Sequence, residues 1–158
     1  KIEKVVDYYN NNKKAEIVFD YPLIVENNNI YSEKKKLKFF KTYWPYIHPT
    51  SCISIKKNNF EKLLKVISYK DFTDVWLDFR ICLFSKYILK DFHIINENLT
   101  FYRKTASNIS SKFVRFSKNW WKRRMQAHQF LQKFCKDNEL NFNKNFDFLL
   151  TKFICKFL

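Results

Sequence analysis

The chain of 158 residues contains no glycine at all. Glycine-rich phosphate loops and dinucleotide-binding turns need glycine for tight turns and for close approach of the backbone to the ligand. The absence of glycine therefore excludes the common P-loop and Rossmann fingerprints. The chain also lacks an uninterrupted apolar run near the roughly 18 residues that a membrane-spanning helix requires. It begins without the features of a signal peptide, so we expect a cytoplasmic location.

Cysteine is scarce, and no two cysteines form a CxxC pair. Free cysteines in apolar surroundings are usually buried, so we expect four buried thiols. The three histidines are scattered as well, and a zinc site made by the protein alone is therefore not expected. The residues in question are Cys52, Cys82, Cys135, Cys155, His48, His93 and His128.

Positive charge, by contrast, is abundant and unevenly distributed. The formal net charge is +15, and residues 101–158 contain thirteen Lys or Arg against three acids. A basic field concentrated in one part of a chain favours an anionic partner there. Nucleic acid, anionic lipid and pyrophosphate all fit this description.

The apolar pattern predicts a mixed α/β fold. Helices are expected at Lys1–Tyr9, with Ile2, Val5, Val6 and Tyr9 on one side, and at residues 58–67, 73–87, 120–134 and 142–157. Strands are expected at residues 15–21, ending before Pro22, and at 52–55, 92–95 and 99–102. Polar loops are expected at Asn27–Asn29 and Lys34–Lys36. We expect one domain over residues 1–117 and a basic, aromatic helical extension over 118–158.

Both C-terminal helices are predicted to be amphipathic. The first would present Trp121, Met125, His128, Leu131 and Cys135 near one face. The second would present Phe142, Phe146, Leu149, Leu150, Phe153 and Phe157. The second helix could pack on the domain, or it could lie in a membrane interface with Lys144, Lys152 and Lys156 towards anionic headgroups.

The segment FTDVWLDFRICLF, from Phe72 to Phe84, carries the clearest functional pattern. Asp74 precedes Arg80 by six residues, and Thr73 could cap the helix that follows. After a break, a predicted strand leads to Tyr102 and Arg103. A carboxylate in the first turn of a helix is also stabilised by the helix dipole, so these residues alone favour a structural role for Asp74 over a catalytic one.

In this order the motifs resemble the carboxy-terminal part of family-two glycosyltransferases of a bacterial cell-surface glycan type, over about Lys1 to Gln132. The resemblance implies a partial GT-A-like domain, the acceptor-side half, without the N-terminal nucleotide-binding strands. It also implies that the chain is a fragment with little transferase activity by itself. The implied partners are a nucleotide-sugar donor and a glycan or lipid-linked acceptor.

The resemblance implies roles for particular residues. Asp74 would be the catalytic base, with Asp78 in support four residues later, although Thr73 stands where the family has a glutamate. Thr50 and Ser51 would contact the acceptor, and Trp76 could stack on a sugar or belong to the core. The diphosphate would meet Arg103 and Lys104.

The family's divalent metal, Mg²⁺ or Mn²⁺, is held by an acidic pair on a strand just before a helix that resembles Lys1–Tyr9. No such pair lies within this chain, so no metal ligand is expected here. Asp20 and Tyr21 resemble the end of the strand that follows the metal site. Their role would be either that of a ligand or that of a core or capping group.

The charge also allows an alternative, a basic nucleic-acid-binding or ribosomal-type protein. In the run WWKRR, Trp120 to Arg124, two aromatic rings that could stack on bases are followed by three cations that could bind phosphate. The aromatic residues nevertheless fall at helix-core spacing, and no known binding module is recognisable. A nucleic-acid partner is therefore the less favoured prediction.

Overall fold

The computed structural model describes residues 1–27, 29–32, 47–68, 70–105, 113–142 and 144–158. The chain forms two compact units. An N-terminal unit contains residues 1–68 and 77–104, and a C-terminal unit contains residues 69–76 and 105–158. Helices and short mixed sheets together give the mixed α/β class that the sequence predicts.

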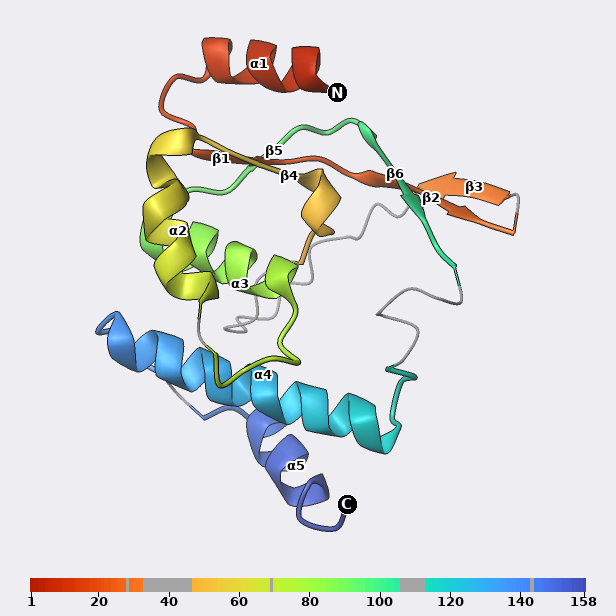
Figure 1. The fold of residues 1–158 in the computed structure, drawn as a ribbon, viewed down its shortest axis with the longest axis vertical. Helices are drawn as coiled ribbons and strands as arrows, with labels where there is room; N and C mark the ends of the chain where they lie inside the picture. Colours follow the sequence, from red (N-terminus) through yellow and green to blue (C-terminus); the bar gives the residue numbers. More distant parts are fainter. Residues whose placement is uncertain (28, 33–46, 69, 106–112, 143) are drawn as a thin grey trace. The chain divides into compact units, whose positions relative to one another are not determined.

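The N-terminal unit contains two three-stranded mixed sheets (Figure 1). In the first sheet, β1 lies between antiparallel β4 and parallel β5, and in the second, β2 lies between antiparallel β3 and parallel β6. The chain passes from β1 into β2 through Asp20 and Tyr21. The strands are β1 (Ile17–Phe19), β2 (Pro22–Glu26), β3 (Asn29–Ser32), β4 (Ile53–Ile55), β5 (His93–Ile94) and β6 (Thr100–Arg103).

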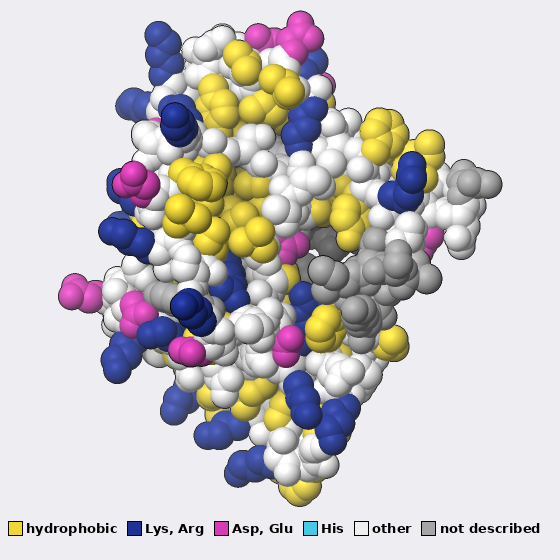
Figure 2. Space-filling view, viewed as in Figure 1, with side chains coloured by type: hydrophobic (Ala, Val, Ile, Leu, Met, Phe, Trp, Pro, Cys, Tyr) yellow, Lys and Arg dark blue, Asp and Glu magenta, His cyan; other side chains and the backbone are white. Residues whose placement is uncertain are grey.

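Helix α1 (Ile2–Asn11) covers one face of the first sheet (Figure 1). Val5, Tyr8 and Tyr9 pack against a buried cluster of Ala15, Val18 and Ile95. The predicted helix is confirmed, but its predicted apolar face is partly wrong. Ile2 and Val6 are 81% and 49% exposed, because the side of the helix that meets the sheet is centred on Val5 and Tyr8. Apolar side chains accordingly show on the surface of this unit (Figure 2).

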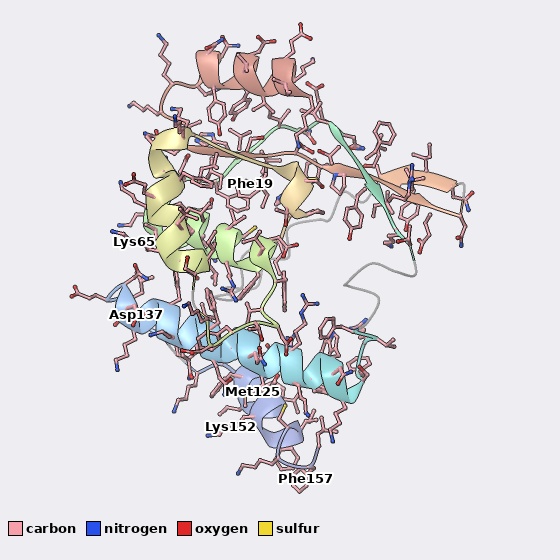
Figure 3. All side chains as sticks on the ribbon, viewed as in Figure 1. Phe19, Lys65, Met125, Asp137, Lys152 and Phe157 are labelled. Carbon is pink, nitrogen blue, oxygen red and sulfur yellow. The ribbon has the colours of Figure 1, made fainter. Side chains whose placement is uncertain are left out.

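The other face of the first sheet is covered by α2 (Phe60–Ile67) and α3 (Leu77–Leu83) (Figure 1). Phe19 points from β1 towards these helices and is fully buried (Figure 3). Its ring stacks on Phe92 with centroids 4.3 Å apart and lies 4.8 Å from the ring of His48. Because successive strand residues point to opposite faces, Val18 and Phe19 fill the two halves of the core.

Several strand predictions hold and others need correction. Strands β1, β4, β5 and β6 lie where the sequence predicts strands. Pro22 does not end the strand region, because it is the first residue of β2, where its missing N–H is tolerated. The β2–β3 hairpin was not predicted; it contains the predicted loop around Asn27. The predicted loop Lys34–Lys36 lies outside the described residues.

The helix predicted at residues 73–87 begins later than expected. Helix α3 starts at Leu77 and continues as a π-helical segment, η3 (Phe84–Leu89). Thr73 is therefore not its cap, and Asp74 precedes the helix instead of opening it. Asp74 and Asp78 consequently do not share a helical face. The physical reason is that residues 69–76 belong to the C-terminal unit, where helix α4 (Lys118–Asp137) binds Asp74.

In the C-terminal unit, α4 packs against α5 (Phe146–Ile154). Ser117 caps α4, accepting a hydrogen bond from the Trp120 amide at 3.2 Å. His128, Leu131 and Cys135 are buried, as the predicted face requires, whereas Trp121 and Met125 are only half-buried. Three further residues of α4 are buried without having been predicted, namely Ala127, Phe130 and Phe134.

The apolar face predicted for α5 is exposed. Phe148 and Thr151 are buried instead, whereas Phe146, Leu149, Leu150, Phe153 and Phe157 of the predicted face are exposed. The side that faces α4 is set by Asp147. Its carboxylate binds Arg124 Nη2 at 2.5 Å and His128 Nε2 at 2.9 Å.

Helix ends without glycine adopt left-handed backbone at ordinary residues. Glu139, just after α4, has φ 54°, and Lys90 at the end of η3 has φ 53°. After α4, the amide of Leu140 donates to the Cys135 carbonyl at 2.8 Å and that of Glu139 to the Lys136 carbonyl at 3.3 Å. This is the Schellman pattern, in which glycine is the usual residue at the position of Glu139.

Within the described ranges, no helix combines the length and the apolar character needed to cross a membrane. The four cysteines are all free thiols. Cys52, Cys82 and Cys135 are buried as predicted, whereas Cys155 is only half-buried.

Candidate functional site

Asp20 lies at the carboxyl end of β1, as the sequence predicts, and it is 1% exposed. Its Oδ2 atom lies 2.6 Å from Nζ of Lys1. A buried carboxylate needs such a counter-charge, because removal from water otherwise disfavours its ionised form. This ion pair gives Asp20 a structural role in anchoring the start of α1.

The Lys1 ammonium group also connects two other segments. It donates to Thr100 Oγ1 at 2.7 Å and to the backbone carbonyl of Ser51. The Thr100 hydroxyl in turn donates to the same carbonyl at 3.3 Å. The first residue of β6 and the short helix η1 (Thr50–Cys52) therefore meet at Lys1, and the side chains of Thr50 and Ser51 are exposed beside this junction.

The thiol next to this junction is not poised for nucleophilic chemistry. Burial, reinforced by the negative charge of Asp20, raises the pKa of Cys52 to about 12. A thiolate is the reactive form of cysteine, so Cys52 acts as a core residue. His48 is also buried, with Nδ1 3.1 Å from the Asp20 carbonyl oxygen.

Arg103 and Lys104 lie at the opposite end of β6, roughly 10 Å from Thr100 at 3.3 Å per residue. Both side chains are exposed. Lys104 Nζ donates to the Tyr31 hydroxyl at 3.0 Å and lies 3.5 Å from Oε2 of Glu26. The hydrogen bond with Tyr31 and the charge of Glu26 raise the pKa of Lys104.

Asp78 is in the first turn of α3 and is half-buried. Its Oδ1 atom accepts a hydrogen bond from the Phe79 amide at 2.9 Å, which satisfies one of the free N–H groups at the helix start. Arg80, the arginine of the predicted motif, is buried and donates from Nη1 to the Ile67 carbonyl at 2.6 Å. It thereby binds the negative end of α2.

Asp74 is an exposed carboxylate of the C-terminal unit. Its Oδ2 atom accepts a hydrogen bond from Gln126 Nε2 at 3.1 Å, while its own amide faces Gln126 Oε1 at 3.3 Å. Nε of Arg123 donates to the Asp74 carbonyl at 2.8 Å. Two residues of α4 thus fix the backbone and the carboxylate of Asp74 while water can still reach the side chain.

The indole of Trp76 belongs to the same arrangement. The Arg123 guanidinium lies 4.5 Å from the Trp76 ring centroid and 4.1 Å from that of Phe113. Guanidinium groups favour this position over aromatic faces. One face of Trp76 is therefore covered by Arg123.

The predicted site residues fall into separate groups. Asp74 and Trp76 lie together in the C-terminal unit. The others belong to the N-terminal unit and lie in three separate places there: Thr50 with Ser51, Asp78 alone, and Arg103 with Lys104. Sequence reasoning missed Gln126 and Arg123. Their spacing of three residues places them on one side of α4, but nothing in the sequence links that side to Asp74.

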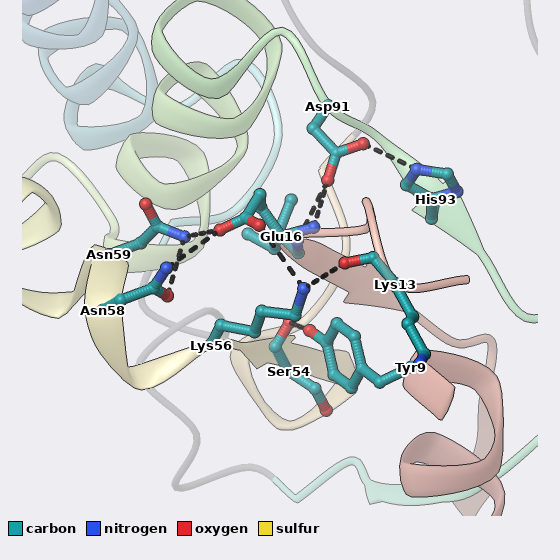
Figure 4. Close-up of polar contacts among 10 residues, drawn as sticks. Tyr9, Lys13, Glu16, Ser54, Lys56, Asn58, Asn59, Asp91 and His93 are labelled. Atoms are coloured by element: carbon teal, nitrogen blue, oxygen red, sulfur yellow. Dashed lines mark hydrogen bonds and ion pairs between the residues drawn. The ribbon is translucent and has the colours of Figure 1, made fainter. Parts of the chain in front are cut away.

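A further polar cluster supports the start of β1 (Figure 4). The Asp91 carboxylate accepts hydrogen bonds from the amides of Glu16 and Ile17 at 2.6 and 3.2 Å, and it binds His93 Nε2 at 2.6 Å. Tyr9 donates to the Ser54 carbonyl at 2.9 Å. These contacts hold α1, β1, β4 and β5 together, so the cluster is part of the scaffold.

The described residues do not fit a divalent metal. None of them form a group of three or more His, Cys, Asp or Glu side chains able to hold a metal ion. Mg²⁺ and Mn²⁺ prefer several oxygen ligands, and the buried carboxylate of Asp20 is paired with Lys1.

No protein-family model matches the chain, and neither the curated proteins nor the solved structures searched contain a match.

Proposed function

We propose that the chain is the acceptor-side part of an inverting glycosyltransferase with a GT-A-like fold. The proposal is supported first by the geometry around Asp74. An exposed carboxylate is held by the amide of Gln126, two residues before the indole of Trp76. A fixed carboxylate beside an aromatic ring suits a sugar, which presents both hydroxyl groups and apolar ring faces.

In the proposed reaction, Asp74 takes a proton from an acceptor hydroxyl as its oxygen attacks the anomeric carbon of the donor sugar. The bond between that carbon and the diphosphate oxygen breaks, and the nucleoside diphosphate leaves with the bonding electrons. One displacement of this kind inverts the anomeric configuration. The base must be ionised and accessible, and the exposure of Asp74 meets the second requirement.

The other predicted residues have supporting roles in this proposal. Thr50 and Ser51, which would contact the acceptor, are exposed beside Lys1. Lys1 is close to the place where the family resembled has its metal-binding acidic pair, just before the helix that α1 resembles. Arg103 and Lys104 are exposed cations that would offset charge on the diphosphate. Lys104 would exchange its contact with Glu26 for one with the diphosphate.

The alternative, a nucleic-acid-binding protein, gains less support from the WWKRR run. Arg123 is held between Trp76 and Phe113, and Arg124 binds Asp147 at 2.5 Å. Both guanidinium groups thus have structural partners within the C-terminal unit. Stacking platforms for single strands instead present their rings and cations together to the ligand.

The test is a transfer assay on the complete gene product that contains this chain. It would be incubated with a set of nucleotide sugars, with and without glycan acceptors, and release of nucleoside diphosphate would be measured. The proposal predicts acceptor-dependent release and a first product whose anomeric configuration, read by proton NMR, is inverted. Retention of configuration, or release that no acceptor increases, would count against it.

A further inference from the structure

Helix α5 and the turn after it expose an apolar surface, here called the α5 face. It consists of Phe146, Leu149, Leu150, Phe153 and Phe157, which are 78%, 52%, 39%, 60% and 75% exposed. At 100° per residue the four residues within the helix fall in an arc of about 100°, and the Phe157 ring packs on that of Phe153 with centroids 5.0 Å apart. A single apolar residue on a surface is ordinary, but five gathered in this way form a patch that indicates a binding surface.

The orientation of α5 on its own unit accounts for this exposure. Phe148 and Thr151 are buried, and the Phe148 ring packs edge-on to His128 with centroids 5.4 Å apart. Asp147 is bonded to Arg124 and His128 of α4. The face opposite the apolar arc is thus already used for packing, so α5 cannot bury the arc by turning over without breaking these contacts.

The charge around the α5 face is of one sign. Lys144, Lys152 and Lys156 are exposed, and Figures 2 and 3 show cationic and apolar side chains together at the C-terminal end of the chain. Asp147 is the one acid among residues 140–158. Burial would raise its pKa, but hydrogen bonds and charge from His128 and Arg124 outweigh burial and lower the pKa to about 2. Its negative charge is thus already neutralised.

We propose that the α5 face binds the surface of an anionic membrane. The phenylalanine and leucine side chains would enter the boundary between headgroups and acyl chains, while the lysines remain at the level of the lipid phosphates. With nine residues, α5 is too short to span the hydrocarbon layer, so it would lie in the plane of the surface. This inference does not depend on the proposed sugar transfer.

Charge favours a membrane over a second copy of the chain. In a twofold symmetric dimer the same patch faces itself, so the three lysines of one copy would be brought close to those of the other. An anionic lipid surface instead complements the three lysines and accepts the apolar side chains between them. The occupant to which we commit is therefore a bilayer rich in acidic phospholipid.

The test is sedimentation of the chain with vesicles of phosphatidylcholine alone and with about one-third phosphatidylglycerol. Binding is expected only to the anionic vesicles and is expected to weaken as salt is added. The double variant Phe153→Ser, Phe157→Ser should bind at least tenfold more weakly. Its matched control is Phe60→Ser, Phe101→Ser, which removes exposed phenylalanines outside α5 and should bind like the parent chain.

Two double variants that remove lysine charges test the electrostatic part of the proposal. Lys152→Gln, Lys156→Gln should weaken binding by roughly tenfold or more, whereas Lys62→Gln, Lys65→Gln on α2 should leave it unchanged. Equal binding by the Phe153, Phe157 variant and its control would overturn the proposal. So would a lipid-free dimer, seen by analytical ultracentrifugation, that becomes a monomer in the Phe153, Phe157 variant, because a second copy would then cover the face.

Discussion

The amide Nε2 of Gln126 lies 3.1 Å from the carboxylate Oδ2 of Asp74, and the two residues are 52 positions apart in the chain. The contact joins a residue of α4 to the segment that precedes α3. It holds an exposed carboxylate in one position without burying it. If Asp74 is the base, Gln126 is a positioning residue for it.

Replacement of Gln126 should accordingly impair catalysis more than folding. Gln126→Leu keeps the size of the side chain but removes the amide, and we expect kcat in the transfer assay to fall about tenfold, equivalent to about 1.4 kcal/mol. KM for the donor should change little. Gln129→Leu, on the exposed side of the same helix, is the control. Equal kcat for the two variants would remove Gln126 from this role.

Asp147 should make the stability of the C-terminal unit depend on pH. Its pKa is lowered to about 2 from 3.8, so its contribution is present above 3.8 and is lost as pH falls towards 2. For a carboxylate one-third exposed we expect about 1–2 kcal/mol at pH 5 after solvent screening, falling to about half at pH 3. Urea unfolding of the parent chain and of Asp147→Asn at both pH values measures this difference. A difference that does not shrink at pH 3 would contradict the account.

The left-handed backbone at Glu139 predicts a stabilising substitution. Glu139→Gly should raise the free energy of unfolding by about 0.5–1 kcal/mol, because glycine adopts this conformation without a Cβ clash. For a chain of this size, each kcal/mol of added stability raises Tm by roughly 2–4 °C. Glu139→Ala, which keeps the Cβ atom, should bring no gain. Thermal unfolding that ranks the two variants equally would show that the turn stores no strain.

The four thiols should differ in reactivity. Burial raises the pKa of Cys52 and Cys82 to about 12 and also raises that of Cys135. Cys155 is half-buried, so it should be the first to react with a disulfide reagent at pH 8, and the others should react only on unfolding. Absorbance of the released thiolate follows the reaction. If a fast phase survives in Cys155→Ser, one of the other thiols is accessible.

The elements with strong local patterns could be predicted from the sequence. The apolar, β-branched run around Ile17 and Val18 predicts a buried strand, and the 3.6-residue period predicts α2 and α4. The position of Asp20 at a strand end also follows from that pattern. What the pattern does not contain is the partner of Asp20, because Lys1 reaches it only through the fold.

Two features depend on contacts between distant residues, and the local sequence pattern could not decide them. Helix α3 begins at Leu77 because the residues before it bind α4, about fifty positions away. Helix α5 turns its most apolar side outwards because Asp147 binds Arg124 and His128. In both cases a tertiary polar contact overrides the local preference, as helix propensity and amphipathic pattern are only weak constraints.

The site could be predicted only in part for the same reason. The spacing of Asp74 and Arg80 points to the segment in which the proposed base lies. Arg80, however, binds the end of α2, and the Asp74 carboxylate is hydrogen-bonded to Gln126 of α4. A single sequence identifies residue types capable of chemistry, but the contacts that hold them come from segments that share no local pattern with them.

The central claim is that Asp74 removes a proton from a sugar acceptor, and one measurement tests it most directly. It is the turnover number of Asp74→Asn in the complete gene product, measured beside Asp78→Asn and beside Asp71→Asn, a neighbouring exposed acid. The account predicts a loss of roughly a thousandfold or more for Asp74→Asn, with an unchanged circular dichroism spectrum, and near-parent turnover for Asp71→Asn. Near-parent turnover of Asp74→Asn would contradict it, and a comparable loss in Asp78→Asn alone would move the base to Asp78.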